Sequence, residues 1–165
     1  NLSLVPRPGH PDFSAFLGGP AGNQRRKGTE VMTRREAREL AVILMFERSF
    51  CDSPMEDILE TAAEARDTEP DDFARDLALG ADSYIVQIDQ KIADHSQNWS
   101  KERISRISMA IMRVAIYEML YKDDIPVSVS INEAVELAKK YGGDDDPGFI
   151  NGVLGGIARS MPETV

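Results

Sequence analysis

Residues 104–116 read ISRISMAIMRVAI, and this stretch decides the fold class. Its branched aliphatic residues recur three, four and three positions apart, which places them on one face of an α-helix. That face consists of Ile104, Ile107, Ile111 and Val114. Ala110, Ala115 and Ile116 widen the face, so we predict a helix at the centre of the protein.

Helical spacing of apolar residues also runs through five further segments, most of them bounded by proline, glycine or a capping residue. These segments are residues 33–46, 54–66, 70–97, 130–141 and 146–157. The alternation at Val127-Ser128-Val129 is too short to form part of a sheet. The sequence therefore predicts an all-α protein of about six or seven helices.

The helix ends carry recognisable signals. Three tetrapeptides match a capping box, in which a hydroxyl accepts an amide hydrogen and a glutamate reaches back. They begin at Thr33, Ser53 and Ser130. We expect Ser100 to cap the central helix, and Asp146-Pro147 to start the last one. Gly142 and Gly143 are expected to end the preceding helix in left-handed conformations.

The charge of the chain is unevenly distributed. It has 19 Lys and Arg against 28 Asp and Glu, and the resulting net charge of −9 argues against a nucleic-acid-binding protein. Residues 1–48 and 99–122, however, carry +3 each, whereas residues 49–98 carry −10 and residues 123–165 carry −5. An acidic protein with basic segments can still present an anion-binding face.

Several classes of function are excluded by what the sequence lacks. A single cysteine, Cys51, allows neither an internal disulfide nor a cysteine-based zinc site, and His10 and His95 lack metal-ligand spacing. No phosphate-binding loop, dinucleotide-binding motif or nucleophile elbow is present, so we predict no enzyme activity, no catalytic residue, no metal and no cofactor. The absence of a leader or of an apolar run near ~20 residues favours a cytoplasmic protein without membrane contact.

Residues 1–31 hold five of the twelve glycines and four of the nine prolines, without any helical or strand spacing. We therefore predict a flexible extension over residues 1–31, as a tag or a translated upstream segment, before a helical domain over residues 32–165.

Three other motifs have a structural interpretation that we favour. Residues 152–156, GVLGG, lie within a helical pattern and indicate close helix packing rather than phosphate binding. Residues 144–146 are three aspartates without calcium-loop spacing, which is typical of a solvated turn. Arg113, Glu118 and Asn132 interrupt apolar periods and predict a buried hydrogen-bond network.

The first helix opens with Arg34, Arg35 and Arg38. Arg34 and Arg38 share a helix face, as do Arg35 and Arg38. Arginines at a helix N-terminus oppose the macrodipole, and a phosphate partner would explain that cost. A solvated face interspersed with Glu36 and Glu39 explains the pattern equally well.

Taken in order, four segments resemble the NusB family of bacterial antitermination factors. They are the arginine-rich residues 34–41 (RREARELA), residues 113–119 (RVAIYEM), residues 131–139 (INEAVELAK) and residues 149–154 (FINGVL). The resemblance covers Thr33 to Ala158. It implies two small helical bundles packed together and no catalytic activity.

The resemblance also implies partners and contact residues. The family pairs with NusE, a small-subunit ribosomal protein, and the pair binds the single-stranded boxA element of nascent RNA. Within the antitermination complex of RNA polymerase, this supports read-through in ribosomal RNA operons. The RNA-binding positions would be Arg34, Arg35, Arg38, Asp145 and Phe149. The NusE-binding positions would be Phe46 and Glu102, while Ser108 replaces a second acidic residue of the family.

Two rival hypotheses remain. A NusB-like domain also precedes some ribosomal RNA cytosine methyltransferases, but those need catalytic cysteines that Cys51 alone does not supply. The second rival is a homodimeric protein-interaction module of the same fold, in which the dimer masks the arginine face and RNA is not bound independently.

Overall fold

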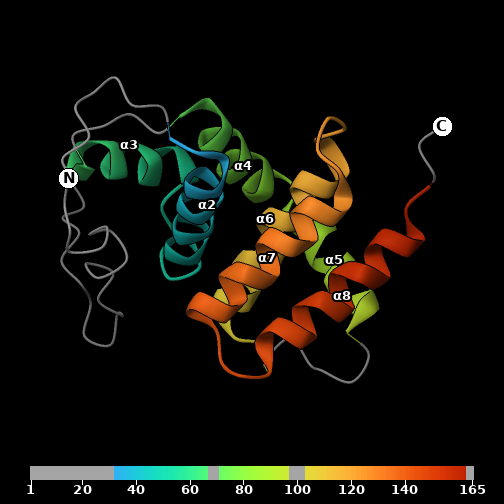
Figure 1. The fold of residues 1–165 in the computed structure, drawn as a ribbon. Coiled ribbons are helices and arrows are strands. Elements are labelled where there is room, and N and C mark those ends of the chain that lie inside the picture. Colours follow the sequence, from blue (N-terminus) through green and yellow to red (C-terminus); the bar gives the residue numbers. More distant parts are fainter. Residues whose placement is uncertain (1–31, 67–70, 97–102, 163–165) are drawn as a thin grey trace.

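The computed structural model describes residues 32–66, 71–96 and 103–162, which form seven helices and no strand (Figure 1). The helices are α2 (Arg34–Arg48), α3 (Met55–Arg66), α4 (Asp72–Ser83), α5 (Ile85–His95), α6 (Arg106–Tyr121), α7 (Val127–Tyr141) and α8 (Asp146–Ser160). The prediction of an all-α protein is confirmed. The expected extension over residues 1–31 lies outside the described residues.

Helix α6 is central, as its wide apolar face predicts. Every residue from Ser108 to Met119 is buried. The helix contacts α2 and α4 from the first part of the chain and α5, α7 and α8 from the second. Because α2, α3 and α4 pack on one another and α5, α7 and α8 pack with α6, the fold consists of two small helical bundles that share α6.

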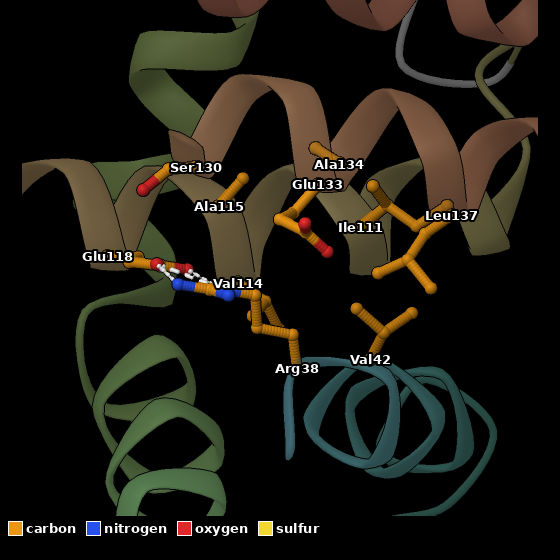
Figure 2. A pocket seen from close by; sticks show the side chains of 10 residues that line it. All are labelled: Arg38, Val42, Ile111, Val114, Ala115, Glu118, Ser130, Glu133, Ala134 and Leu137. Carbon is orange, nitrogen blue, oxygen red and sulfur yellow. Dashed lines mark hydrogen bonds and ion pairs between the residues drawn. The ribbon is translucent and has the colours of Figure 1, made fainter. Parts of the chain in front are cut away.

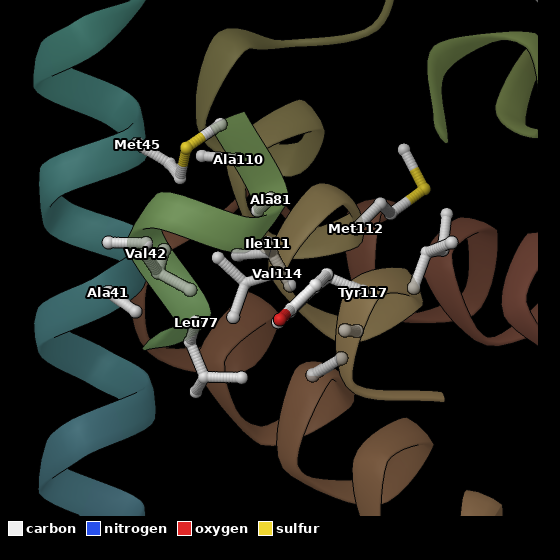
Figure 3. Close-up of a cluster of buried hydrophobic side chains, with 14 of the residues drawn as sticks. Ala41, Val42, Met45, Leu77, Ala81, Ala110, Ile111, Met112, Val114 and Tyr117 are labelled. Carbon is white, nitrogen blue, oxygen red and sulfur yellow. The ribbon is translucent and has the colours of Figure 1, made fainter. Parts of the chain in front are cut away.

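A single buried apolar cluster runs through both bundles. Figure 3 shows the part of it in which α2, α4 and α6 meet. There α2 contributes Val42 and Met45, α4 contributes Leu77, and α6 contributes Ile111 and Val114. Burial of such side chains contributes about 1.5–3 kcal/mol each, so this shared core holds the first bundle against the second.

The start of α2 follows the predicted capping box. The Glu36 amide donates to the Thr33 hydroxyl at 3.1 Å, and the Thr33 amide donates to the Glu36 carboxylate at 3.3 Å. The box predicted at Ser130 is wrong, because α7 already begins at Val127, directly after Pro126. Ser130 therefore lies inside the first turns of α7, buried and without a hydrogen-bond partner for its hydroxyl.

Two other expected boundaries differ. The N-cap of α6 is Ser105, whose hydroxyl accepts from the Ser108 amide at 3.2 Å; Ser100 lies outside the described residues. The helix expected over residues 70–97 is broken at Tyr84, which has φ −103° and ψ 20°. The break lets α4 pack on α2 while α5 packs on α8, and apolar spacing cannot reveal it because both parts remain amphipathic.

Two glycines allow a close approach. Gly142 is extended, with φ −95° and ψ 178°, so the expected left-handed conformation is wrong there. A Cβ at this position would lie 2.8 Å from both the Ala138 carbonyl oxygen and Asp146 Oδ2. A Cβ at Gly156 would lie 3.0 Å from the His95 ring, so this glycine of the motif allows close packing on α5, whereas a Cβ at Gly152 would meet nothing within 4 Å.

The predicted buried polar network is correct for two residues and wrong for the third. Arg113 on α6 donates to both carboxylate oxygens of Asp89 on α5, each at 2.8 Å. Glu118 pairs with Arg38 of α2 in the interior. Asn132 is exposed, because the buried stripe of α7 runs through Ser130, Ala134 and Leu137 and leaves position 132 on the opposite face.

Candidate nucleic-acid interface

The two exposed arginines at the start of α2 contact different neighbouring helices. The Arg34 guanidinium lies over the Phe73 ring of α4, 3.9 Å from its centroid. Arg35 donates to both carboxylate oxygens of Glu133 on α7, at 3.1 and 3.0 Å. The hydrogen bond and the charge of Glu133 raise the pKa of Arg35. Both guanidiniums are held at the surface, where an anionic ligand can reach them.

Arg38 lies one turn further along α2 and faces the interior. Its guanidinium donates to Glu118 of α6, with Nε–Oε1 at 2.9 Å, Nε–Oε2 at 3.0 Å and Nη2–Oε1 at 2.5 Å. Only 8% of the Arg38 side chain and 1% of the Glu118 side chain are exposed. Figure 2 shows this pair at the wall of a small cavity of about 10 Å³, which Ser130 and Leu137 of α7 also line.

A third set of polar contacts ties α2 to α7. Glu39 accepts from Lys140 at 2.5 Å and from the hydroxyl of Tyr141. Burial, and then the hydrogen bond to Glu39, raises the pKa of Tyr141, and the same glutamate raises the pKa of Lys140. Carboxylates therefore flank the arginines of α2 on the side that faces α7.

The two other residues assigned to RNA by resemblance lie on a different element, at the start of α8. Asp145 is exposed at the N-cap position and makes no side-chain capping hydrogen bond. Phe149 lies in the first turn of α8, half-buried against the apolar core. The structure therefore divides the expected RNA face between the start of α2 and the start of α8.

The expected partner-binding surface is described in part. Phe46 is half-buried near the end of α2, and its ring meets Phe50 edge-to-face at 5.1 Å. Arg106 of α6 lies over the Phe50 ring at 4.4 Å and donates to the Ser49 carbonyl at 2.8 Å. Glu102 lies outside the described residues.

Ser108, at the position where the resemblance implies an acidic residue, is fully buried at the start of α6. Its amide and its hydroxyl both bond to the Ser105 hydroxyl, at 3.2 and 2.9 Å. This side chain therefore helps to cap α6.

Sequence reasoning missed the side chains that hold the arginines. No binding role is predicted from the sequence for Phe73 or Glu133, although each contacts an exposed arginine. Beside Arg34, an open hollow is lined by carboxylates of α4, including Asp72 and Asp76, and by Lys122 at the end of α6. The sequence does contain an aromatic residue and a glutamate that could pair with the arginines. Glu133, however, is about a hundred residues from Arg35, so only the folded structure shows that the two side chains meet.

The described residues contain neither a membrane-spanning helix nor a metal-binding cluster. Across residues 32–66, 71–96 and 103–162, no helix is both long and apolar enough to cross a bilayer. In the same part of the chain, no three histidine, cysteine or carboxylate side chains are placed to hold a metal ion.

Comparison with known proteins places the chain in a family. The NusB family model matches residues 35–159. The transcription antitermination protein NusB of Bacillus velezensis is 44% identical over 130 residues, which is 79% of this chain and 98% of that protein. The protein of the same name from Bacillus subtilis is 40% identical over 133 residues, covering 81% of this chain and all of that protein.

Solved structures agree with this placement. NusB of T. maritima has a TM-score of 0.69 and 32% identity, over 79% of this chain and 94% of that one. A structure of antitermination factors NusB and NusE in complex with dsRNA has a TM-score of 0.69 over 78% of this chain and 97% of that one, and at 22% identity it supports the fold alone. This chain belongs to the NusB family of transcription antitermination proteins.

Proposed function

We propose that this protein is a transcription antitermination factor that binds single-stranded RNA through Arg34 and Arg35 at the start of α2. The observation that carries this proposal is the exposure of two guanidiniums at a helix N-terminus, where the macrodipole disfavours cations. A guanidinium makes bidentate contacts with phosphate and stacks on unpaired bases, so an RNA strand suits this position.

Arg38 takes a different part in the proposed site. Its guanidinium is already paired with the Glu118 carboxylate in the interior. To bind a phosphate, Arg38 would have to leave this carboxylate buried and unpaired. We therefore assign Arg38 a positioning role: it fixes the first turns of α2 on α6, and so holds Arg34 and Arg35 in place.

The proposal extends to the start of α8. Phe149 would stack on a base and Asp145 would border the same strand, as the family resemblance implies. A stacked base contributes about 1–3 kcal/mol, which is comparable to the contribution of a charged phosphate contact.

We further propose that the RNA is boxA and that NusE shares its recognition, within an RNA polymerase complex that reads through ribosomal RNA operons. Two arginine–phosphate contacts give a log–log salt slope of only about −1.4, which is small for tight binding by one protein. A net charge of −9 favours a basic partner, which Phe46 and Glu102 would contact. A solved structure of the same fold contains NusB and NusE in complex with dsRNA.

A polarization assay with labelled boxA RNA tests this function, with a scrambled RNA for comparison and with NusE present or absent. We expect boxA to bind more tightly than the scrambled RNA, most clearly with NusE, and Arg34→Ala/Arg35→Ala to weaken boxA binding. Arg159→Ala, an exposed arginine in the last turn of α8, removes a charge elsewhere and serves as the control.

Equal affinity for boxA and scrambled RNA under both conditions would overturn the proposal. Sedimentation at several salt concentrations tests the rival hypothesis of a homodimeric module. A homodimer that masks Arg34 and Arg35 would have to dissociate before these arginines could bind RNA.

A further inference from the structure

A second exposed surface lies on the far side of the hollow that Arg34 also lines. Where the junction of α4 and α5 meets the end of α6, three tyrosine rings pack together. Tyr84 and Tyr121 stack with centroids 4.6 Å apart and ring planes 21° apart. Tyr117 lies 5.2 Å from Tyr121 and 6.3 Å from Tyr84. We call these three residues the tyrosine cluster.

Tyr117 is the fixed base of the cluster. It is buried, and its hydroxyl donates to Asp76 Oδ1 at 2.9 Å. Its ring lies so close to Gly80 of α4 that a Cβ at Gly80 would overlap the ring carbons. The ring therefore needs glycine at position 80, and it lies beneath the two outer rings.

The two outer rings, those of Tyr84 and Tyr121, are exposed to solvent. Tyr84 is 38% exposed and Tyr121 is 46% exposed. Among the described residues, only two other large apolar side chains are exposed, and one of them, Val86, lies two positions after Tyr84. Exposed apolar side chains that gather at one place, rather than singly, mark interaction surfaces.

The charges around the tyrosine cluster favour a cation. Asp123 and Asp124 follow Tyr121 and Lys122 directly and are both exposed. Asp76, beneath the cluster, is paired with Lys122, so that cation is already neutralised. The adjoining hollow is lined by Asp71 and Asp72 and, on the side of α2, by Arg34, so its carboxylates outnumber the one cation that is not paired with Asp76. An RNA strand would bring its phosphates against these carboxylates, whereas a cationic side chain would be attracted to them.

We propose that the tyrosine cluster and its carboxylates bind an arginine-bearing segment of a protein partner. A guanidinium stacks on an exposed tyrosine ring and pairs with the carboxylate of Asp123 or Asp124. Arginine fits better than lysine, because its planar group stacks on an aromatic ring and still donates two parallel hydrogen bonds. The arginines of α2 would remain free for RNA.

The test uses the full chain with labelled tyrosine rings, titrated separately with an arginine–glycine peptide, the matching lysine–glycine peptide and oligouridine, and followed by NMR. We expect the arginine peptide to shift the Tyr84 and Tyr121 rings and to bind about threefold more tightly than the lysine peptide. The Tyr84→Leu/Tyr121→Leu variant should bind the arginine peptide about fivefold more weakly, as measured by the shift of the Tyr117 ring signals.

A second pair of variants avoids any change to the apolar packing. Asp123→Asn/Asp124→Asn should weaken the arginine peptide more than Glu56→Gln/Asp57→Asn, which removes the same charge from exposed positions on α3. Equal weakening by both pairs, or unchanged binding to the tyrosine variant, would overturn the proposal. Tyrosine shifts caused by oligouridine alone would also overturn it, because the surface would then bind RNA.

Discussion

Two arginine–glutamate pairs join α2 to the second bundle, and they differ in burial. Arg35–Glu133 lies at the surface, where 70% of the Arg35 side chain is exposed. Arg38–Glu118 lies in the interior, with 8% and 1% exposed. Water screens the first pair, so Arg35 can exchange its glutamate for phosphate at little cost. The second pair cannot lose one partner without leaving a buried charge unpaired. Burial, rather than residue type, therefore separates a binding arginine from a positioning one.

The largest expected effect comes from breaking the buried pair. Arg38→Ala leaves the Glu118 carboxylate buried and unpaired, so we expect the free energy of unfolding to fall by about 3–5 kcal/mol in urea titrations. Arg38→Met/Glu118→Leu removes both charges and keeps the volume, and it should recover most of the loss. An Arg38→Ala variant as stable as the wild type would contradict the interior placement of this pair.

RNA binding should separate the two pairs next. Arg35→Ala should weaken boxA binding about tenfold and make the salt slope shallower by about 0.7. Arg38→Met/Glu118→Leu should bind within about twofold of wild type, because its changed groups face the interior. Polarization assays at several salt concentrations measure both quantities. A tenfold loss in the Met/Leu variant, with its stability intact, would instead make Arg38 an RNA contact.

A smaller effect is expected from releasing Arg35. Glu133→Gln removes a carboxylate beside the proposed phosphate position, and we expect RNA affinity to rise by about fivefold with no measurable change in the urea midpoint. Glu56→Gln on α3 removes the same charge at a distance and should change RNA affinity little. If the two variants behave alike, general acidity rather than the Arg35–Glu133 contact limits binding.

The smallest effect is a pH dependence of the contact that Glu39 of α2 makes with Lys140 and Tyr141 of α7. The pKa values of Tyr141 and Lys140 are raised in the fold, so each contributes stability below its unfolded pKa that is lost as pH rises through the folded value. Stability should therefore decline above about pH 10. Thermal melts from pH 9 to 11 should show a shallower decline in Tyr141→Phe. An equal decline in both proteins would assign the effect to other groups.

The fold was predictable where local chemistry decides it. The capping box at Thr33 and the apolar face of α6 both appear as the sequence predicts. Ser130 matched the same four-residue pattern and failed, because Pro126 starts α7 earlier and the hydroxyl turns inward. The break at Tyr84 was not predictable either, since the need to pack α4 and α5 on different helices is a property of the assembled protein.

The candidate site shows the same division. Sequence spacing places Arg38 on a face with both Arg34 and Arg35, and this grouped the three as one surface. Only the position of Glu118, eighty residues away on the central helix, separates Arg38 from the other two. Glu118 was itself correctly predicted to be buried and hydrogen-bonded. Its partner could not be identified from periodicity, because periodicity says that a side chain faces inward but not what it meets.

The central position of α6 also constrains the order in which a nascent chain can fold. The apolar faces of α2 and α4 are covered by α6, which ends at Tyr121. During synthesis those faces stay uncovered until most of the chain has left the ribosome. The first bundle cannot mature as an independent early unit, so we expect it to need protection from aggregation for longer than its place in the sequence indicates.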